Sequence, residues 1–155
     1  MTKWRFRVLY SLLPLVLALA GCRVGGAVTT PAPGAVDLQT QKVPVEGGGS
    51  YTDVNAAGLA AMLEDKDFPL INVHIPYEGE IPDTDLFIPY NEVEANLEKL
   101  PPDRGAKLVL YCRSGGMSAI AARTLVKLGY TNVWNLDGGM IGWEQAGYPL
   151  LHEAQ

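Results

Sequence analysis

The residues best suited to chemistry lie in one short segment, Cys112-Arg113-Ser114-Gly115-Gly116-Met117-Ser118. An apolar run at residues 108–111 precedes the cysteine and predicts a buried strand, and residues 118–128 predict a helix. The glycines between them allow a tight turn whose backbone amides point inward, a geometry that binds anions at a helix N-terminus. We therefore predict that Cys112 reacts as a stabilised thiolate.

Each residue of this loop has a predicted role. Cys112 is the predicted catalytic nucleophile, and the predicted substrate-binding residues are Arg113, Ser114, Gly115, Gly116, Met117 and Ser118. Arg113 is interpreted either as an anion-attracting group or as a solvated loop residue. Ser118 is expected to be the helix N-cap alone, and an N-cap that also donates its hydroxyl to a persulfide on Cys112 is the alternative. A buried structural cysteine is the alternative for Cys112 itself.

The N-terminal residues have the pattern of an export signal. Lys3, Arg5 and Arg7 precede an apolar stretch at residues 8–20 that is too short to span a bilayer, which predicts a signal peptide over residues 1–21. The following Leu-Ala-Gly-Cys sequence, ending at Cys22, resembles a bacterial lipobox and implies lipidation of Cys22. We expect an exported protein, lipid-anchored to a bacterial membrane in the cell envelope or periplasm. A secretory signal with an incidental Cys22 is the alternative.

Charge and cysteine content narrow the function. Removal of residues 1–21 leaves nine basic against 17 acidic side chains, a net charge of −8, which argues against a nucleic-acid partner. With Cys22 acylated, Cys112 is the only free thiol and no intramolecular disulfide can form. His74 and His152 have no metal-ligand spacing with this thiol, so we predict neither a metal nor a cofactor. His74 is interpreted as a structural histidine, with proton handling as the alternative.

Composition and periodicity divide the chain into three parts. Residues 1–21 are the signal peptide, residues 22–50 are a flexible tether rich in Gly and Pro, and residues 51–155 are the folded domain. In that domain, apolar runs predict strands at residues 68–73, 86–90, 108–111 and 132–136, and helical patterns lie at residues 56–63 (with Asn55 as N-cap), 91–100, 118–128 and around 143–146. This alternation predicts an α/β fold with a mainly parallel sheet flanked by helices on both faces.

Several separated stretches resemble the rhodanese-like family, and together they cover about residues 51–150. Leu70-Ile71-Asn72-Val73-His74 is similar to the family's first buried strand with its Asp-Val-Arg end, and Gly79-Glu80-Ile81-Pro82 is similar to its Gly-His-Ile-Pro turn. Residues 109–115 match the strand that leads into the family's active-site loop and the first residues of that loop. Residues 129–133, Leu136-Asp137-Gly138-Gly139 and Trp143 match the segment that closes the fold.

The resemblance implies a single-domain sulfurtransferase with a doubly wound α/β fold and a mainly parallel five-stranded sheet flanked by helices on both faces. In this family a cysteine thiolate takes sulfane sulfur from a donor such as thiosulfate or another persulfide or polysulfide, holds it as a persulfide and passes it to a thiophilic acceptor. The implied partners are a small sulfur donor, a thiol acceptor and the membrane, and we expect a monomer. The alternative is a catalytically weak rhodanese-like module for binding or redox sensing in the cell envelope.

The chain departs from the family pattern at three places. Many relatives carry arginine at the last position of the six-residue loop, where this chain has Met117, and this favours a less charged donor or the use of Arg113. Asn72 and His74 replace the aspartate and arginine of Asp-Val-Arg, and Glu80 replaces a histidine. The related cysteine phosphatases need a seven-residue loop ending in arginine, and Ser118 at that position argues against phosphatase activity.

Overall fold

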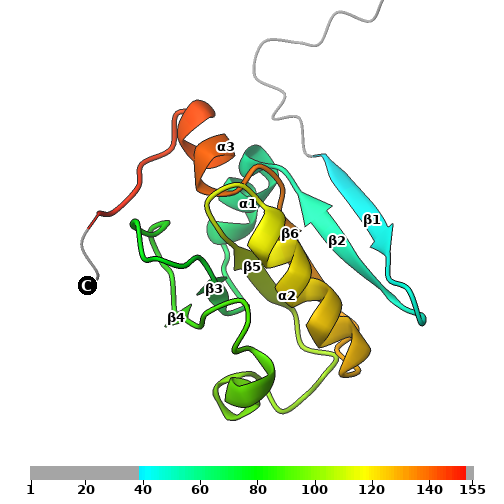
Figure 1. The fold of residues 1–155 in the computed structure, drawn as a ribbon. Coiled ribbons are helices and arrows are strands. Elements are labelled where there is room, and N and C mark those ends of the chain that lie inside the picture. Colours follow the sequence, from blue (N-terminus) through cyan, green and yellow to red (C-terminus); the bar gives the residue numbers. More distant parts are fainter. Residues whose placement is uncertain (1–38, 153–155) are drawn as a thin grey trace, which may run out of the picture. The chain divides into compact units, whose positions relative to one another are not determined.

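The computed structural model describes residues 39–152, in which six strands form one sheet (Figure 1). Their order across the sheet is β1-β2-β6-β5-β3-β4. The strands are β1 (Thr40–Pro44), β2 (Ser50–Val54), β3 (Leu70–Asn72), β4 (Leu86–Phe87), β5 (Leu108–Tyr111) and β6 (Val133–Leu136). Only the β1–β2 pair is antiparallel among these neighbours. The predicted mainly parallel α/β sheet is confirmed, with six strands in place of five.

The extra strand comes from a segment predicted to be tether. Val43 pairs with Tyr51 across an antiparallel hairpin, and Val45 is buried in the core beside them. The glycine run that resembles a linker is the hairpin turn, because residues 47–49 all have positive φ, which glycine adopts without strain. The tether prediction is therefore wrong for residues 40–50.

The remaining N-terminal predictions lie outside the described residues. These are the signal peptide at residues 1–21, the lipidation site Cys22 and the tether up to residue 38. Within residues 39–152, no helix is both long and apolar enough to cross a membrane.

Helices cover both faces of the sheet. They are α1 (Ala56–Leu63), the 3-10 helix η1 (Glu94–Lys99), α2 (Gly116–Lys127) and α3 (Gly139–Gln145). Figure 1 shows α2 lying in front of β5 and β6, and its apolar side packs into the same core cluster as residues flanking η1. Helices α1 and α3 contact each other and belong to the cluster on the opposite face.

The helix predicted at residues 56–63 is confirmed, whereas the helix predicted at residues 91–100 agrees only in part. Helix α1 has the predicted bounds, and the Asn55 side chain accepts a hydrogen bond from the Gly58 N–H at 2.8 Å, as expected of an N-cap. The helix predicted at residues 91–100 is instead η1, which is interrupted at Asn96, where φ is −125° and ψ is 30°. The Asn96 side chain donates to the Glu92 carbonyl at 2.8 Å and so competes with the regular helical pattern. The apolar side of the predicted helix, formed by Val93, Leu97 and Leu100, nevertheless faces the core: Val93 and Leu100 are buried and Leu97 is half-buried.

Strand β5 crosses the centre of the sheet and is buried on both faces. Leu108 and Leu110 face the core under α2, whereas Val109 and Tyr111 face the core under α1 and α3. All four side chains are 0% exposed, which is typical of a central parallel strand. The residue that follows β5, Cys112, is therefore held at the carboxyl end of the most constrained strand of the sheet.

A close backbone contact joins the loop that follows β5 to the start of α3. The N–H groups of Met140 and Ile141 donate to the carbonyls of Cys112 and Arg113 at 2.9 and 3.0 Å. Gly139 has a φ of +56°, and a Cβ placed on it would lie 2.3 Å from the Cys112 carbonyl oxygen. No residue other than glycine fits this position without a shift of the cysteine loop.

We predict that Gly139→Ala lowers the free energy of unfolding by at least about 2 kcal/mol, because it adds both left-handed strain and a backbone clash. Urea unfolding followed by circular dichroism measures the change. The matched control is Gly116→Ala, since that Cβ meets nothing within 4 Å and the backbone is helical. The control is expected to shift stability by no more than about 1 kcal/mol. Equal stability of the two variants would contradict the role given to Gly139.

Candidate active site

The Cys112 sulfur lies inside the loop between β5 and α2. Its residue is only 1% exposed, and Sγ accepts a hydrogen bond from the Gly115 N–H at 3.1 Å. Gly115 has a φ of +90°, and this left-handed conformation turns its amide toward the sulfur. A second donor, the Ser118 hydroxyl, lies 3.4 Å from Sγ. Both contacts stabilise negative charge on the sulfur.

Ser118 is not the N-cap that the sequence predicts. Helix α2 begins at Gly116, and the N-cap is Gly115. The Ser118 hydroxyl lies within the first turn, where it reaches both the Gly115 carbonyl at 3.1 Å and Cys112 Sγ. A hydroxyl has one proton to donate, and a charged acceptor attracts it more strongly than a neutral carbonyl. The part of the alternative prediction that this geometry fits is the hydroxyl directed at the sulfur.

The other loop residues differ in their surroundings. Arg113, Ser114 and Gly116 are exposed, whereas Met117 is half-buried against the core under α2. The Arg113 guanidinium forms an ion pair with the Glu78 carboxylate. The one cation of the loop therefore has a partner from a different part of the chain.

Asn72 orients the segment that carries this partner. The Asn72 side chain is 0% exposed; its Oδ1 accepts from the His74 N–H and its Nδ2 donates to the Gly79 carbonyl, both at 3.0 Å. Asparagine satisfies both groups, whereas an ionised aspartate could not donate to the carbonyl. Asn72 thus fixes both ends of the loop that contains Glu78.

Glu78 also lies next to His74. The imidazole Nε2 is 3.5 Å from the Glu78 carboxylate, an ion-pair distance rather than a hydrogen bond. His74 is 6% exposed, and within the described residues neither ring nitrogen has a hydrogen-bond partner. The hydrogen bond from Arg113, with a smaller contribution from His74, lowers the pKa of the Glu78 carboxyl. The expected structural histidine with satisfied nitrogens is not observed.

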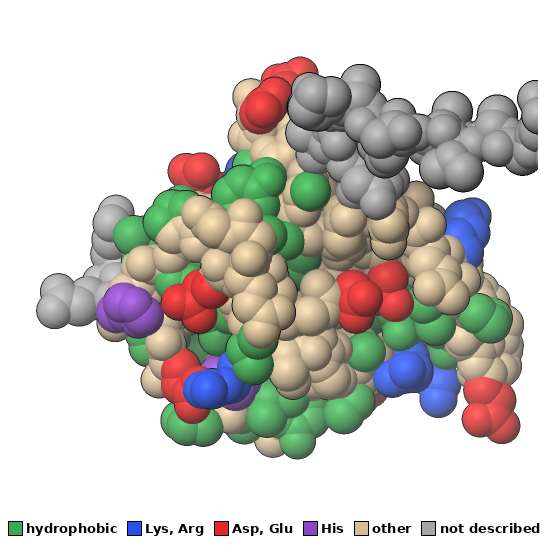
Figure 2. Space-filling model, turned by 90° about the horizontal axis from the view of Figure 1, so that it is seen from above, with side chains coloured by type: hydrophobic (Ala, Val, Ile, Leu, Met, Phe, Trp, Pro, Cys, Tyr) green, Lys and Arg blue, Asp and Glu red, His purple; other side chains and the backbone are tan. Residues whose placement is uncertain are grey.

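A small pocket of about 160 Å³ adjoins this ion pair. It is lined by Glu78, Arg113, Met140, Ile141, Glu144, Leu150 and His152. Figure 2 looks onto this end of the molecule and shows a basic group against an acidic one beside a histidine, with further acidic groups spread across the face. Within residues 39–152, no group of three or more His, Cys, Asp or Glu side chains is placed to hold a metal ion.

Comparison with known proteins identifies the family of the fold. Residues 55–146 match the rhodanese-like domain, which is more than half of the chain. The chain belongs to the rhodanese-like family. It is 35% identical over 103 residues to a sulfurtransferase of Allochromatium vinosum, an alignment that covers 64% of this chain and 94% of that protein. Together these matches support a function of the sulfurtransferase type.

Solved structures agree with this assignment. A rhodanese-related protein of Thermoplasma volcanium superposes with a TM-score of 0.56 at 30% identity, covering 65% of this chain and 98% of that one. A thiosulfate sulfurtransferase of Pseudomonas aeruginosa gives a TM-score of 0.57 at 28% identity. That alignment covers 66% of this chain but only 20% of the Pseudomonas protein, which is far longer.

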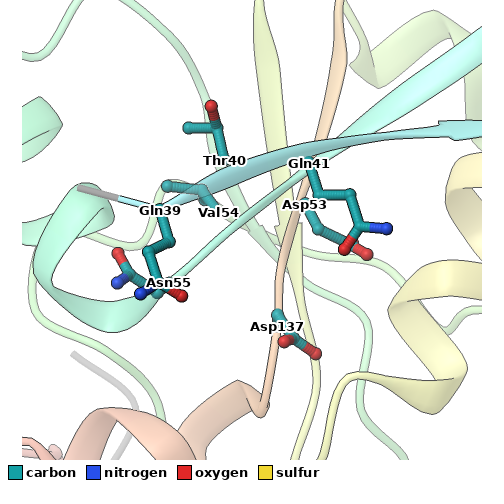
Figure 3. Close-up of a pocket in the computed structure, with 7 residues that line it drawn as sticks. All are labelled: Gln39, Thr40, Gln41, Asp53, Val54, Asn55 and Asp137. Atoms are coloured by element: carbon teal, nitrogen blue, oxygen red, sulfur yellow. The ribbon is translucent and has the colours of Figure 1, made fainter. Parts of the chain in front are cut away.

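A larger pocket of about 390 Å³ lies at the β1–β2 edge of the sheet (Figure 3). It is lined by Gln39, Thr40, Gln41, Asp53, Val54, Asn55 and Asp137. Figure 3 shows the carboxylates of Asp53 and Asp137 extending to the same side. Burial, together with the nearby Asp137 charge, raises the pKa of Asp53, although the Asn135 side chain donates to it at 2.7 Å. The pocket thus brings together a carboxylate from β2 and one from the residue that follows β6, which are distant in sequence.

We predict that Asp53→Asn stabilises the protein at neutral pH, because it removes a partly buried charge and keeps an oxygen for Asn135. Because the pKa of Asp53 is higher in the folded state than in the unfolded state, protonated Asp53 favours folding at low pH. The wild type loses that stability as pH rises from the unfolded-state pKa of about 3.9 through the higher folded-state pKa. The gain in melting temperature should therefore be present at pH 7 and disappear near about pH 3. Thermal unfolding at both pH values measures it, and a gain that is independent of pH would contradict the assignment.

Sequence reasoning missed Glu78, which is the residue that most changes the electrostatics of the loop. It lies 35 residues from Arg113, so no local pattern connects the two. The available signal was indirect: a lone cation in an acidic chain is expected to find a carboxylate. Asp137, which the sequence places in the segment that closes the fold, contributes its side chain to the larger pocket, and its N–H donates to the Val54 carbonyl at 2.9 Å.

Proposed function

We propose that the protein is a sulfurtransferase that moves sulfane sulfur from a small donor to a thiol acceptor through a persulfide on Cys112. The observation that supports it most directly is the placement of Cys112 Sγ, which accepts from the Gly115 amide and lies near the Ser118 hydroxyl at the end of β5. These donors stabilise the Cys112 thiolate, both as the nucleophile of the first transfer and as the leaving group of the second. The proposed enzyme acts as a monomer.

The proposed reaction has two transfers. In the first, the Cys112 thiolate attacks the outer sulfur of the donor; with thiosulfate, the S–S bond of the donor breaks and its electron pair leaves with sulfite. In the second, an acceptor thiolate attacks the outer sulfur of the Cys112 persulfide and restores the Cys112 thiolate. Each step exchanges one S–S bond for another, so neither needs an external oxidant or reductant.

Charge around the loop supports a donor with little negative charge. Met117 supplies no cation at the last loop position, and Arg113 is paired with Glu78. The anion stabilisation that remains comes from backbone amides and the Ser118 hydroxyl, which are neutral dipoles. Persulfides and polysulfides of small thiols fit this environment better than the thiosulfate dianion does.

We predict that Cys112 gains the mass of one sulfur atom when the purified protein is incubated with thiosulfate, a thiosulfonate or a low-molecular-weight persulfide. Intact-mass and peptide mass spectrometry locate the adduct, and Cys112→Ser is the control that should remain unmodified. Absence of added sulfur with every donor would rule out the enzyme. It would favour the alternative, a rhodanese-like binding or redox-sensing module, which the 1% exposure of Cys112 also suits.

We also propose that the protein is a lipoprotein that works at a bacterial membrane, held through Cys22. The lipobox-like residues before Cys22 and the basic and apolar segments ahead of them support this. A folded domain that carries a net negative charge has little attraction for anionic lipid headgroups, so the lipid would supply the attachment.

Metabolic labelling with a palmitate analogue tests the lipid anchor. The wild-type protein should carry the label and sediment with membranes, and Cys22→Ser should lose both properties. Cys112→Ser is the matched control for the second cysteine and should retain the label. Labelling that persists in Cys22→Ser would exclude Cys22 as the lipidated residue.

A further inference from the structure

Arg113, the cation next to the nucleophile, is bound to a carboxylate of the protein itself. Its guanidinium contacts the Glu78 carboxylate although the Arg113 side chain is 55% exposed and the Glu78 side chain is 37% exposed. An exposed arginine beside a reactive thiolate would attract any anionic substrate that approaches. Here that attraction is already neutralised by Glu78.

Glu78 faces a second nitrogen group as well. The buried His74 imidazole approaches the same carboxylate with Nε2 at 3.5 Å, and no other hydrogen-bond partner for its ring is present among the described residues. One carboxylate thus lies between the guanidinium and the imidazole. This is the position in which the anionic group of a substrate would find its best electrostatic partners.

The loop that presents Glu78 is fixed at several points. Asn72 holds it through the Gly79 carbonyl, and Glu80 exchanges two backbone hydrogen bonds with Leu151, at 2.7 and 2.8 Å. Because the backbone on the C-terminal side of Glu78 is held, the carboxylate loses less conformational freedom in reaching Arg113 than one on a mobile loop would. The ion pair is therefore preorganised.

The adjacent pocket of about 160 Å³ offers no replacement for Arg113. Arg113 is the only lysine or arginine among its lining residues, and a second carboxylate, Glu144, belongs to the same lining. An anionic donor that enters there meets two carboxylates and one guanidinium. It must displace Glu78 to use the positive charge.

We propose that Glu78 is a specificity-determining residue, a built-in competitor that keeps Arg113 from anionic donors and so selects against highly charged sulfur compounds. This inference rests on the proposed sulfur transfer through Cys112. The penalty should grow with the charge of the donor, so a dianion such as thiosulfate is disfavoured more than a monoanionic thiosulfonate. Both donors react in the same way: the thiolate takes the outer sulfur, and sulfite or a sulfinate leaves with the electron pair.

The test compares Michaelis constants of the full chain for thiosulfate and for benzenethiosulfonate. Glu78→Gln should lower KM for thiosulfate about two- to fivefold, the range that release of an exposed ion pair supports. The decrease for the monoanion should be smaller. Glu78→Ala provides a second variant without the carboxylate and should behave in the same way. Thermal unfolding checks that both variants remain folded.

Two controls distinguish the effect of the Glu78–Arg113 ion pair from the effect of negative charge anywhere in the pocket. Glu144→Gln removes an equal charge from the same lining but not the carboxylate that contacts Arg113, so its effect on KM for thiosulfate should be clearly smaller. In an Arg113→Gln background, Glu78→Gln should give no further decrease in KM. An equal effect of Glu144→Gln, an effect that persists without Arg113, or an unchanged or raised KM in Glu78→Gln would each overturn the proposal.

Failure of this inference can be distinguished from failure of the proposed function. If wild type and Glu78→Gln both acquire sulfur on Cys112 with the same donor preference, the enzyme stands and the role of Glu78 falls. If neither acquires sulfur from any donor while both remain folded, the sulfur transfer itself is wrong, and the inference falls with it.

Discussion

The geometry of the reactive loop depends on a backbone contact between that loop and the start of α3. The amides of Met140 and Ile141 donate to the carbonyls of Cys112 and Arg113, and Gly139 allows the two segments to approach this closely. No side chain takes part in these hydrogen bonds. The loop is thus positioned by backbone groups that any sequence supplies, provided that glycine stands at the point of contact. Its own side chains are left free to determine what it binds.

The charges around the site come from side chains, because backbone groups alone position the loop. The donors nearest the sulfur are an amide and a hydroxyl, which carry no net charge. Formal charges lie further out: the Glu78 carboxylate contacts the Arg113 guanidinium, and the Asp53 and Asp137 carboxylates line the pocket at the β1–β2 edge. The neutral donors stabilise a small anion that forms on the buried sulfur, whereas the carboxylates further out repel a large anion that arrives from solvent. The site can therefore stabilise a sulfur anion on Cys112 and still bind an anionic donor weakly.

Features determined by residues close together in the sequence could be predicted, whereas features determined by residues far apart in the sequence could not. Strand β5 and helix α1 have the predicted bounds because a four-residue apolar run and an Asn N-cap are local signals. The β1–β2 hairpin was missed because a glycine run has the same composition in a linker and in a turn; the signal that distinguishes them is the alternation of Val43 and Val45 beside it. The helix at residues 91–100 was correct in its buried face but not in its type, since one asparagine side chain competes for the backbone.

Within the site, the nucleophile and its turn could be predicted, but their neighbours could not. Cys112 and the glycines after it are adjacent in sequence, and the resemblance to a known family adds the order of the other segments. The contact of Glu78 with Arg113 depends on how two loops meet at the edge of the sheet, and it carries no local sequence pattern. Long-range ion pairs of this kind are the part of a site that needs the structure.

The two edges of the sheet have a consequence for a protein confined to a surface. One edge is β1, an exposed strand that carries Lys42 and Pro44; the other is β4, only two residues long. A charged side chain, a missing backbone donor and a very short strand each hinder the pairing of one sheet with another. If the proposed lipid holds many copies on one membrane, they collide far more often than they would in bulk solution. The sheet would then tolerate crowding in two dimensions without joining edge to edge.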